Sequence, residues 1–194
     1  MTEIKLLDFM KKCQQDDEDA AILIPDNEHF EHALNLLINS CNGSIKALIL
    51  FNESNNKSHL FEAITKSQII INLRDFLKEG NTSLHIVTNK QKIIRDSAMF
   101  QRISSIPNIE KTRVTINSIK PEKMKEIKAD GLDHEFIIGT PSAALLFAPS
   151  DDSENKTNPD VSEDIIVNYG DKPFHDLLSQ FISRASSGHI GLES

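Results

Sequence analysis

His134 is the residue of this 194-residue chain whose type and setting point most directly to chemistry. It opens the apolar run "HEFIIG", and an imidazole acts as a nucleophile or as a general acid and base near neutral pH. Asp130, Asp133 and Glu135 surround it, and no Lys or Arg occurs from 129 to 148. This setting would repel a phosphodiester unless another segment or subunit supplied cations. The alternative interpretation is a solvated or hydrogen-bonded histidine at the edge of a strand.

A second candidate site is the basic stretch from 90 to 128, which holds ten Lys or Arg residues against four Asp or Glu. Its candidate contacts for phosphate or nucleic acid are Arg95, Arg102, Arg113 and Lys120, because neutralised phosphates supply most non-specific affinity. Phe100 is its only aromatic residue, so the stretch offers little aromatic surface on which bases could stack. We therefore favour a solvated surface, or one that complements the chain's own acidic segments and promotes self-association.

Several classes of site are disfavoured by the sequence. It contains no glycine-rich nucleotide loop and no G-x-S-x-G nucleophile elbow. His29 and His32 lack an evident third ligand, so we interpret them as solvent-facing residues of a helix rather than a metal site. Cys13 and Cys41 have no zinc-type spacing and are interpreted as structural thiols buried like small hydrophobic residues. We expect no metal and no cofactor.

Composition and charge favour a cytoplasmic chain that contacts no membrane. The formal net charge of −8 disfavours non-specific attraction to nucleic acid or to anionic lipid. Apolar runs such as "KALILF" fall far short of the roughly 20 residues that cross a bilayer. The N-terminal segment also lacks the basic, apolar and small-residue regions of a secretory signal.

The elements that position these residues alternate along the first half of the chain. Short apolar runs predict strands, each followed by a helical pattern, which is typical of right-handed crossovers and parallel strands. The expected strands are 19–25, 45–51 and 83–88, with helices over 26–43, 59–81 and 89–107. A further strand over 113–119 and a short helix over 120–130 follow. Three closely spaced strands, 134–139, 143–149 and 163–170, then favour antiparallel pairing, and a helix over 171–186 ends the order.

We therefore predict one α/β domain spanning 1–194, with a mixed, largely parallel sheet of about seven strands and helices on both faces. Residues 1–19 form an N-terminal helical extension in this prediction. Residues 150–161 are expected to form an exposed acidic loop, and 187–194 a loose tail.

The order of crossover strands, "HEFIIGTPSAALLFAP", a polar loop and "EDIIVNYGDKPFHDLLSQF" resembles that of a single phospholipase D-like domain. Members of that family carry H-x-K-x(4)-D, in which the histidine attacks phosphorus and the lysine helps to hold the phosphate's charge. His134 matches the nucleophile position, but Phe136 and Pro141 stand where the lysine and the aspartate would be. The resemblance therefore implies a degenerate member that lacks the catalytic motif.

This resemblance implies a non-catalytic binding or regulatory module. It also implies a homodimer, because catalytic members pair two motifs across a two-fold interface; a protein partner is a further expectation. One alternative is a phosphodiesterase or nuclease that uses His134 with substitute cations such as Arg113 or Lys120. The second alternative is nucleic-acid binding through the basic stretch, which the net charge disfavours.

Overall fold

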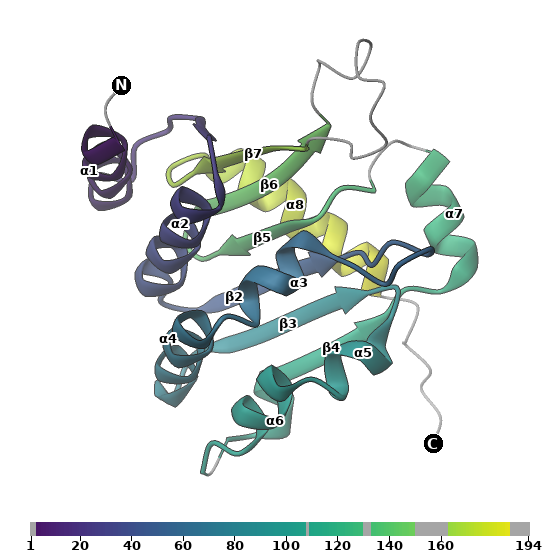
Figure 1. Cartoon of the computed structure of the whole chain (residues 1–194). Coiled ribbons are helices and arrows are strands. Elements are labelled where there is room, and N and C mark those ends of the chain that lie inside the picture. The colour runs from purple at the N-terminus through teal and green to yellow at the C-terminus, as the bar shows by residue number, and fades with distance from the viewer. Residues whose placement is uncertain (1–2, 108, 130–132, 150–162, 187–194) are drawn as a thin grey trace.

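The computed structural model describes residues 3–107, 109–129, 133–149 and 163–186. These residues form a seven-stranded sheet with helices on both faces (Figure 1). The predicted acidic loop over 150–161 and the predicted tail over 187–194 lie outside the described residues. No described helix is both long enough and apolar enough to cross a bilayer.

The sheet has the strand order β1-β7-β6-β5-β2-β3-β4. The strands are β1 (Ile22–Ile24), β2 (Ser44–Ile49), β3 (Ser83–Thr88), β4 (Val114–Ser118), β5 (Phe136–Gly139), β6 (Ala143–Pro149) and β7 (Glu163–Asn168). β2, β3 and β4 pair in parallel, whereas the other four pairings are antiparallel. The predicted mixed seven-stranded sheet is confirmed. Fewer of its strand pairs are parallel than expected, because β1 pairs with β7 at the far edge of the sheet instead of pairing with β2.

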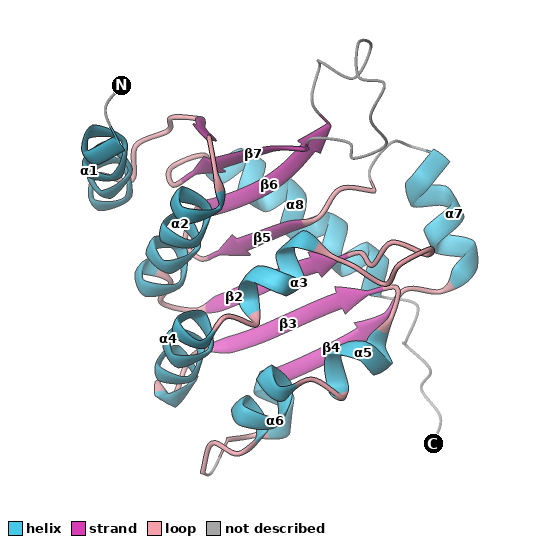
Figure 2. Ribbon diagram, viewed as in Figure 1, coloured by secondary structure: helices cyan, strands magenta, loops and turns pink. Residues whose placement is uncertain are grey.

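The helices divide into two layers (Figure 2). They are α1 (Glu3–Gln15), α2 (Asn27–Ser40), α3 (His59–Ile64), α4 (Ser67–Lys78), α5 (Gln91–Arg95), α6 (Ala98–Ser104), the 3₁₀ turn η1 (Lys111–Arg113), α7 (Pro121–Ala129) and α8 (Lys172–Ser186). The larger apolar cluster lies between one face of the sheet and the layer that contains α2, α4 and α6. The smaller cluster joins the other face to α8 and α7.

Two helices that the periodicity predicts as continuous are each broken in two. The expected helix over 59–81 divides at Lys66, whose backbone is extended, into α3 and α4. The one over 89–107 divides at Ser97, which is also extended and whose Oγ accepts a hydrogen bond from the Phe100 N–H at 3.2 Å. At this second break a serine hydroxyl caps a new helix instead of continuing the old one, a role that serine favours.

His29 lies inside the fold, so its interpretation as a solvent-facing residue is wrong. The residue is 3% exposed, and Nδ1 lies 2.9 Å from both carboxylate oxygens of Asp26, the N-cap residue of α2. His32 is half-buried, and burial lowers its pKa. The described residues contain no group of side chains suited to hold a metal ion. Cys13 and Cys41 are buried free thiols, as predicted.

The connection between α1 and β1 packs against the turn that joins β7 to α8. Asp17 has a positive φ of 48°, and the Asn168 side-chain amide donates to the Asp19 carboxylate at 2.8 Å. A Cβ on Gly170 would lie 2.1 Å from the carbonyl oxygen of Asp17 and 2.6 Å from the Asp19 nitrogen. Only a residue without a side chain fits this close approach of two backbones.

We predict that Gly170→Ala lowers the free energy of unfolding by about 2 kcal/mol or more, because the methyl group collides with backbone that cannot rotate away. Urea unfolding measures the loss. Gly80→Ala is the matched control, since nothing lies within 4 Å of its added Cβ. Equal stability of the two variants would contradict the close approach at Gly170.

Candidate functional site: a polar pocket at the strand ends

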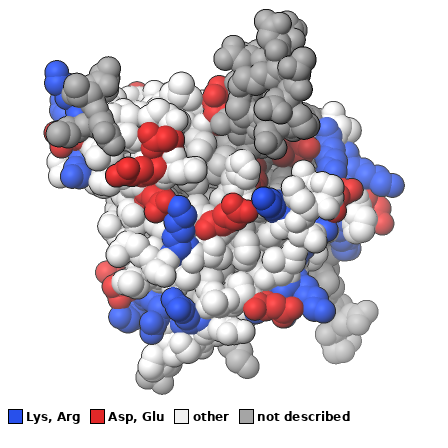
Figure 3. Space-filling view, in the orientation of Figure 1, with Lys and Arg blue, Asp and Glu red and all other residues white. Residues whose placement is uncertain are grey.

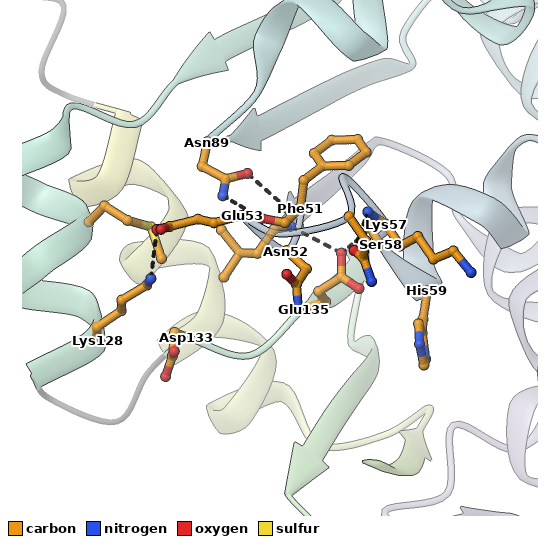
Figure 4. Close-up of a pocket in the computed structure, with 13 residues that line it drawn as sticks. Phe51, Asn52, Glu53, Lys57, Ser58, His59, Asn89, Lys128, Asp133 and Glu135 are labelled. Atoms are coloured by element: carbon orange, nitrogen blue, oxygen red, sulfur yellow. Dashed lines mark hydrogen bonds and ion pairs between the residues drawn. The ribbon is translucent and has the colours of Figure 1, made fainter. Parts of the chain in front are cut away.

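A pocket of about 800 Å³ lies at the carboxyl ends of β2 and β3. Ligands of open α/β sheets commonly bind at such strand ends. Because β5 runs antiparallel to β2, the residues that precede β5 reach the same edge, and α7 adds a further wall (Figure 4). The described lining residues are Leu50, Phe51, Asn52, Glu53, Asn55, Lys57, Ser58, His59, Asn89, Met124, Lys128, Asp133 and Glu135.

Glu135 is the most deeply buried acid of this lining, with 7% of its surface exposed. One carboxylate oxygen accepts hydrogen bonds from the Leu50 N–H at 3.0 Å and from the Ser58 hydroxyl at 2.5 Å. The other accepts from the Leu60 N–H at 3.2 Å. Ser58 is also the N-cap of α3, accepting from the Phe61 N–H at 2.9 Å. The buried carboxylate thus joins the start of β5 to the end of β2 and the beginning of α3.

Three asparagines of the lining turn their side-chain oxygens toward the protein backbone. The oxygens of Asn52, Asn55 and Asn89 accept from the backbone N–H groups of Ser54, Lys57 and Phe51, respectively, at 2.9 to 3.0 Å. Only the oxygen of a carboxamide accepts from an N–H, so these contacts fix the orientation of each amide. The amide nitrogens of Asn52 and Asn55 therefore face outward as donors, whereas the Asn89 amide nitrogen donates to the Phe51 carbonyl at 2.8 Å.

The charged residues of the lining differ in how they are engaged. Lys128 of α7 donates to Glu53 at 2.9 Å, and this hydrogen bond and charge lower the pKa of Glu53. Lys57 and Asp133 are exposed, and among the described residues neither side chain has a hydrogen bond or ion pair. The pocket thus presents one ammonium and one carboxylate that have no partner within the described protein.

The structure places His134 beside the pocket rather than in it. Asp133 and Glu135 line the pocket, whereas the half-buried His134 between them is not among its lining residues. Phe136 is 2% exposed and packs on Phe181 of α8, with ring centroids 6.1 Å apart. Pro141 is exposed beyond the other end of β5. The three positions of the motif pattern therefore do not meet at one point.

The four basic candidates lie on different elements. Arg95 on α5, Arg102 on α6 and Lys120 before α7 are exposed. On the face shown in Figure 3, Lys and Arg atoms form several separate groups with Asp and Glu atoms between them. Arg113, in η1, is half-buried and hydrogen-bonds to the protein's own backbone.

The Arg113 guanidinium closes the carboxyl end of α4. Its Nε donates to the Thr82 carbonyl at 2.7 Å, and a terminal nitrogen donates to the Leu77 carbonyl at 2.8 Å and to the Glu79 carbonyl. The last carbonyls of a helix lack intrahelical partners, and a basic side chain often satisfies them. Arg113 thus joins the turn after α4 to the segment that precedes β4.

Sequence reasoning did not identify Glu135, Ser58 or Asn89 as site residues. Asn89 carried a usable signal, because it directly follows a buried strand at the carboxyl end where ligands bind. Ser58 directly precedes a helical run, and a serine at that position is typical of an N-cap. Glu135 was considered only as part of the acidic setting of His134.

No family model matches this sequence, and no curated protein matches it either. Similar solved structures nevertheless exist. TrmBL2, an archaeal chromatin protein whose structure shows a novel mode of DNA binding, is 8% identical with a TM-score of 0.54; the match covers 94% of this chain and 58% of TrmBL2. The chain therefore spans less than two thirds of that protein.

Two further similar structures are smaller proteins. NucT from Helicobacter pylori is 11% identical with a TM-score of 0.52, and the match covers 86% of this chain and 94% of NucT. Nuc from Salmonella typhimurium, a phospholipase D family member, is 12% identical with a TM-score of 0.50, and the match covers 87% of this chain and 94% of Nuc. At these identities the comparisons show the fold alone. The chain has a phospholipase D-like fold.

We predict that Glu135→Gln lowers the free energy of unfolding by about 2 kcal/mol. The amide retains one acceptor oxygen but places an NH₂ group against a donor, so a buried N–H is left without an acceptor. Equilibrium unfolding in urea measures the change. Asp133→Asn, two residues away and exposed, is the control and is expected to stay within about 0.5 kcal/mol of wild type. A loss no larger than that of the control would show that the Glu135 contacts do not stabilise the fold.

Proposed function

We propose that this chain is a non-catalytic binding module on a phospholipase D-like fold, and that the pocket at the strand ends holds its ligand. The observation that carries the proposal is that the buried polar groups of the lining, Ser58 and Glu135, are engaged in hydrogen bonds that join elements of the fold. His134 is not among the described residues that line the pocket. The Ser58 hydroxyl lines it, but both donates to Glu135 and accepts from Phe61, so it serves the structure.

The environment of residues 136 and 141 supports the absence of catalysis. A transferring phosphoryl group needs preorganised positive charge, which the family places two residues after its histidine. Here that position belongs to the apolar cluster beneath α8, where Phe136 packs on Phe181. Pro141 stands at the far end of β5 and offers no carboxylate. Core packing at Phe136 thus stands where the family's motif has a charged residue, and this supports the proposed loss of catalysis.

The pocket is suited to convert ligand binding into a change of structure, because its walls come from two separate elements. The loop between β2 and α3 contributes Asn52, Glu53 and Asn55, and α7 contributes Met124 and Lys128. The ion pair between Glu53 and Lys128 is exposed and screened by solvent, so it holds the loop and α7 together only weakly, and a ligand can alter how they approach each other. Displacement of α7 is the regulatory output that we propose.

The enzymatic alternative is tested by hydrolysis of bis(p-nitrophenyl) phosphate, single-stranded DNA and RNA. We expect wild type and His134→Ala to give the same background rate on all three substrates. A wild-type rate above background that His134→Ala abolishes would overturn the non-catalytic proposal. His85→Ala, at a histidine on β3 that does not line the pocket, controls for non-specific effects of losing an imidazole.

Homodimerisation is part of the same proposal. Leu23 on the edge strand β1 and Leu177 on α8 are 59% and 61% exposed and provide apolar contact area. Sedimentation velocity at micromolar concentration is expected to give the mass of two chains. Leu177→Glu is expected to shift the population toward one chain, and Leu36→Glu on α2 serves as a comparison at a less exposed leucine. A compact wild-type monomer would refute the dimer.

A further inference from the structure

We propose that Asn42 and Gly43 form a site of spontaneous covalent modification, at which the chain deamidates without any enzyme. The two residues lie between α2 and the first residue of β2, whereas the pocket lies at the other end of that strand. The proposal therefore goes beyond the proposed function and does not depend on the pocket or its ligand. It rests on the two residue types, on the exposure of Asn42, and on the backbone groups that the fold leaves without partners there.

Deamidation begins with the backbone nitrogen of the residue that follows an asparagine. That nitrogen loses its proton to hydroxide and attacks the carbonyl carbon of the asparagine side chain. A C–N bond forms, the bond to the side-chain NH₂ group breaks, and ammonia leaves with a proton taken from water. Water then opens the resulting five-membered succinimide on either side, which gives aspartate or isoaspartate. Glycine after the asparagine favours the reaction, because it has no side chain to hinder the approach and its backbone rotates most freely.

The reacting groups of Asn42 and Gly43 are both available in the folded chain. The sequence contains no other asparagine that is followed by glycine. Asn42 is exposed, and among the described residues its side chain has no hydrogen-bond partner. The Gly43 N–H also lacks a partner among them, although the N–H groups just before it, of Cys41 and Asn42, both donate to carbonyls. The attacking nitrogen thus loses no hydrogen bond when it reacts.

Two other exposed asparagines lack these conditions. The nitrogen that follows Asn81 is that of Thr82, which donates to the Glu79 carbonyl at 3.3 Å and belongs to a residue with a stiff, β-branched side chain. The nitrogen that follows Asn56 donates to the side-chain oxygen of Asn55 at 3.0 Å. Exposure alone therefore does not make an asparagine reactive here, and both residues serve as internal controls.

Modification at this place affects the fold, because the two residues hold neighbouring segments together. The Asn42 N–H donates to the Thr140 carbonyl at 3.3 Å, and the Gly43 carbonyl accepts from the Ser83 N–H at 3.0 Å. A Cβ on Gly43 would lie only 2.6 Å from the Thr140 Oγ1, so the segments approach closely. Isoaspartate adds one atom to the main chain between the two hydrogen bonds and displaces one from the other. It also adds one negative charge to the formal net charge of −8.

Incubation of the folded full chain at 37 °C and pH 8 for several weeks tests the proposal. Mass spectrometry of tryptic peptides is expected to show a gain of about 1 Da at Asn42 but not at Asn81 or Asn56. Isoelectric focusing is expected to show a more acidic species. Because the attacking nitrogen must lose a proton, incubation at pH 6 is expected to give less of it. Asn42→Gln is the matched control and is expected to give none, since its longer side chain would have to close a less favoured six-membered ring.

Several outcomes would overturn the proposal. One is an Asn42 that is unchanged after the incubation, and another is a gain of mass at Asn81 or Asn56 as fast as at Asn42. A third is an acidic species that forms equally in Asn42→Gln. The same incubation in urea supplies the unfolded reference. An Asn42 that reacts in urea but not in the folded chain would show that the native turn blocks the reaction, which also overturns the proposal.

The effect on the fold is measured on the acidic species after its separation from the unmodified chain. Labelling by a protein isoaspartyl methyltransferase shows how much of it contains isoaspartate. Its urea midpoint is expected to lie below that of the unmodified chain. Asn42→Asp carries the added charge without the longer main chain and is expected to keep the wild-type midpoint. An isoaspartate species with the wild-type midpoint would overturn the structural role given to this junction.

Discussion

The burial of the Glu135 carboxylate is the constraint on which the strand-end region depends. A carboxylate removed from water costs several kcal/mol unless hydrogen bonds replace its hydration. Here the donors come from the end of β2, the N-cap of α3 and the first turn of that helix. The loop that precedes α3 must therefore return to the sheet where β5 begins. The asparagines of that loop, and the pocket they border, follow from this one contact.

The antiparallel placement of β5 beside β2 makes the contact available. In a fully parallel sheet the start of β5 would lie at the opposite edge from the carboxyl end of β2. The reversed direction brings residues 133–135 to the edge where β2 and β3 end. It also places Phe136 and Ile138 on the face that α8 covers. The polar residues that line the pocket are therefore followed directly, in the sequence, by residues of the apolar core.

The sequence predicts those features that repeat locally and misses those that join distant segments. Long apolar periodicities placed the strands and most helices, and the hydroxyl of Ser97 shows why one periodic run divided. The burial of His29 was missed because solvent exposure was inferred from its polarity rather than from its reach to Asp26. The partners of Glu135 stand 75 to 85 residues away in the chain, so no local pattern reveals them.

The assembly of the pocket from segments near residues 50–59, 89, 124–128 and 133–135 also couples binding to folding. None of these segments can form the cavity until β2 has paired with both β3 and β5, so the site exists only in the cooperatively folded chain. Any ligand that occupies it selects the folded state over the unfolded one by mass action. Occupancy would therefore raise the melting temperature of the folded chain, by an amount that grows with the concentration of the ligand.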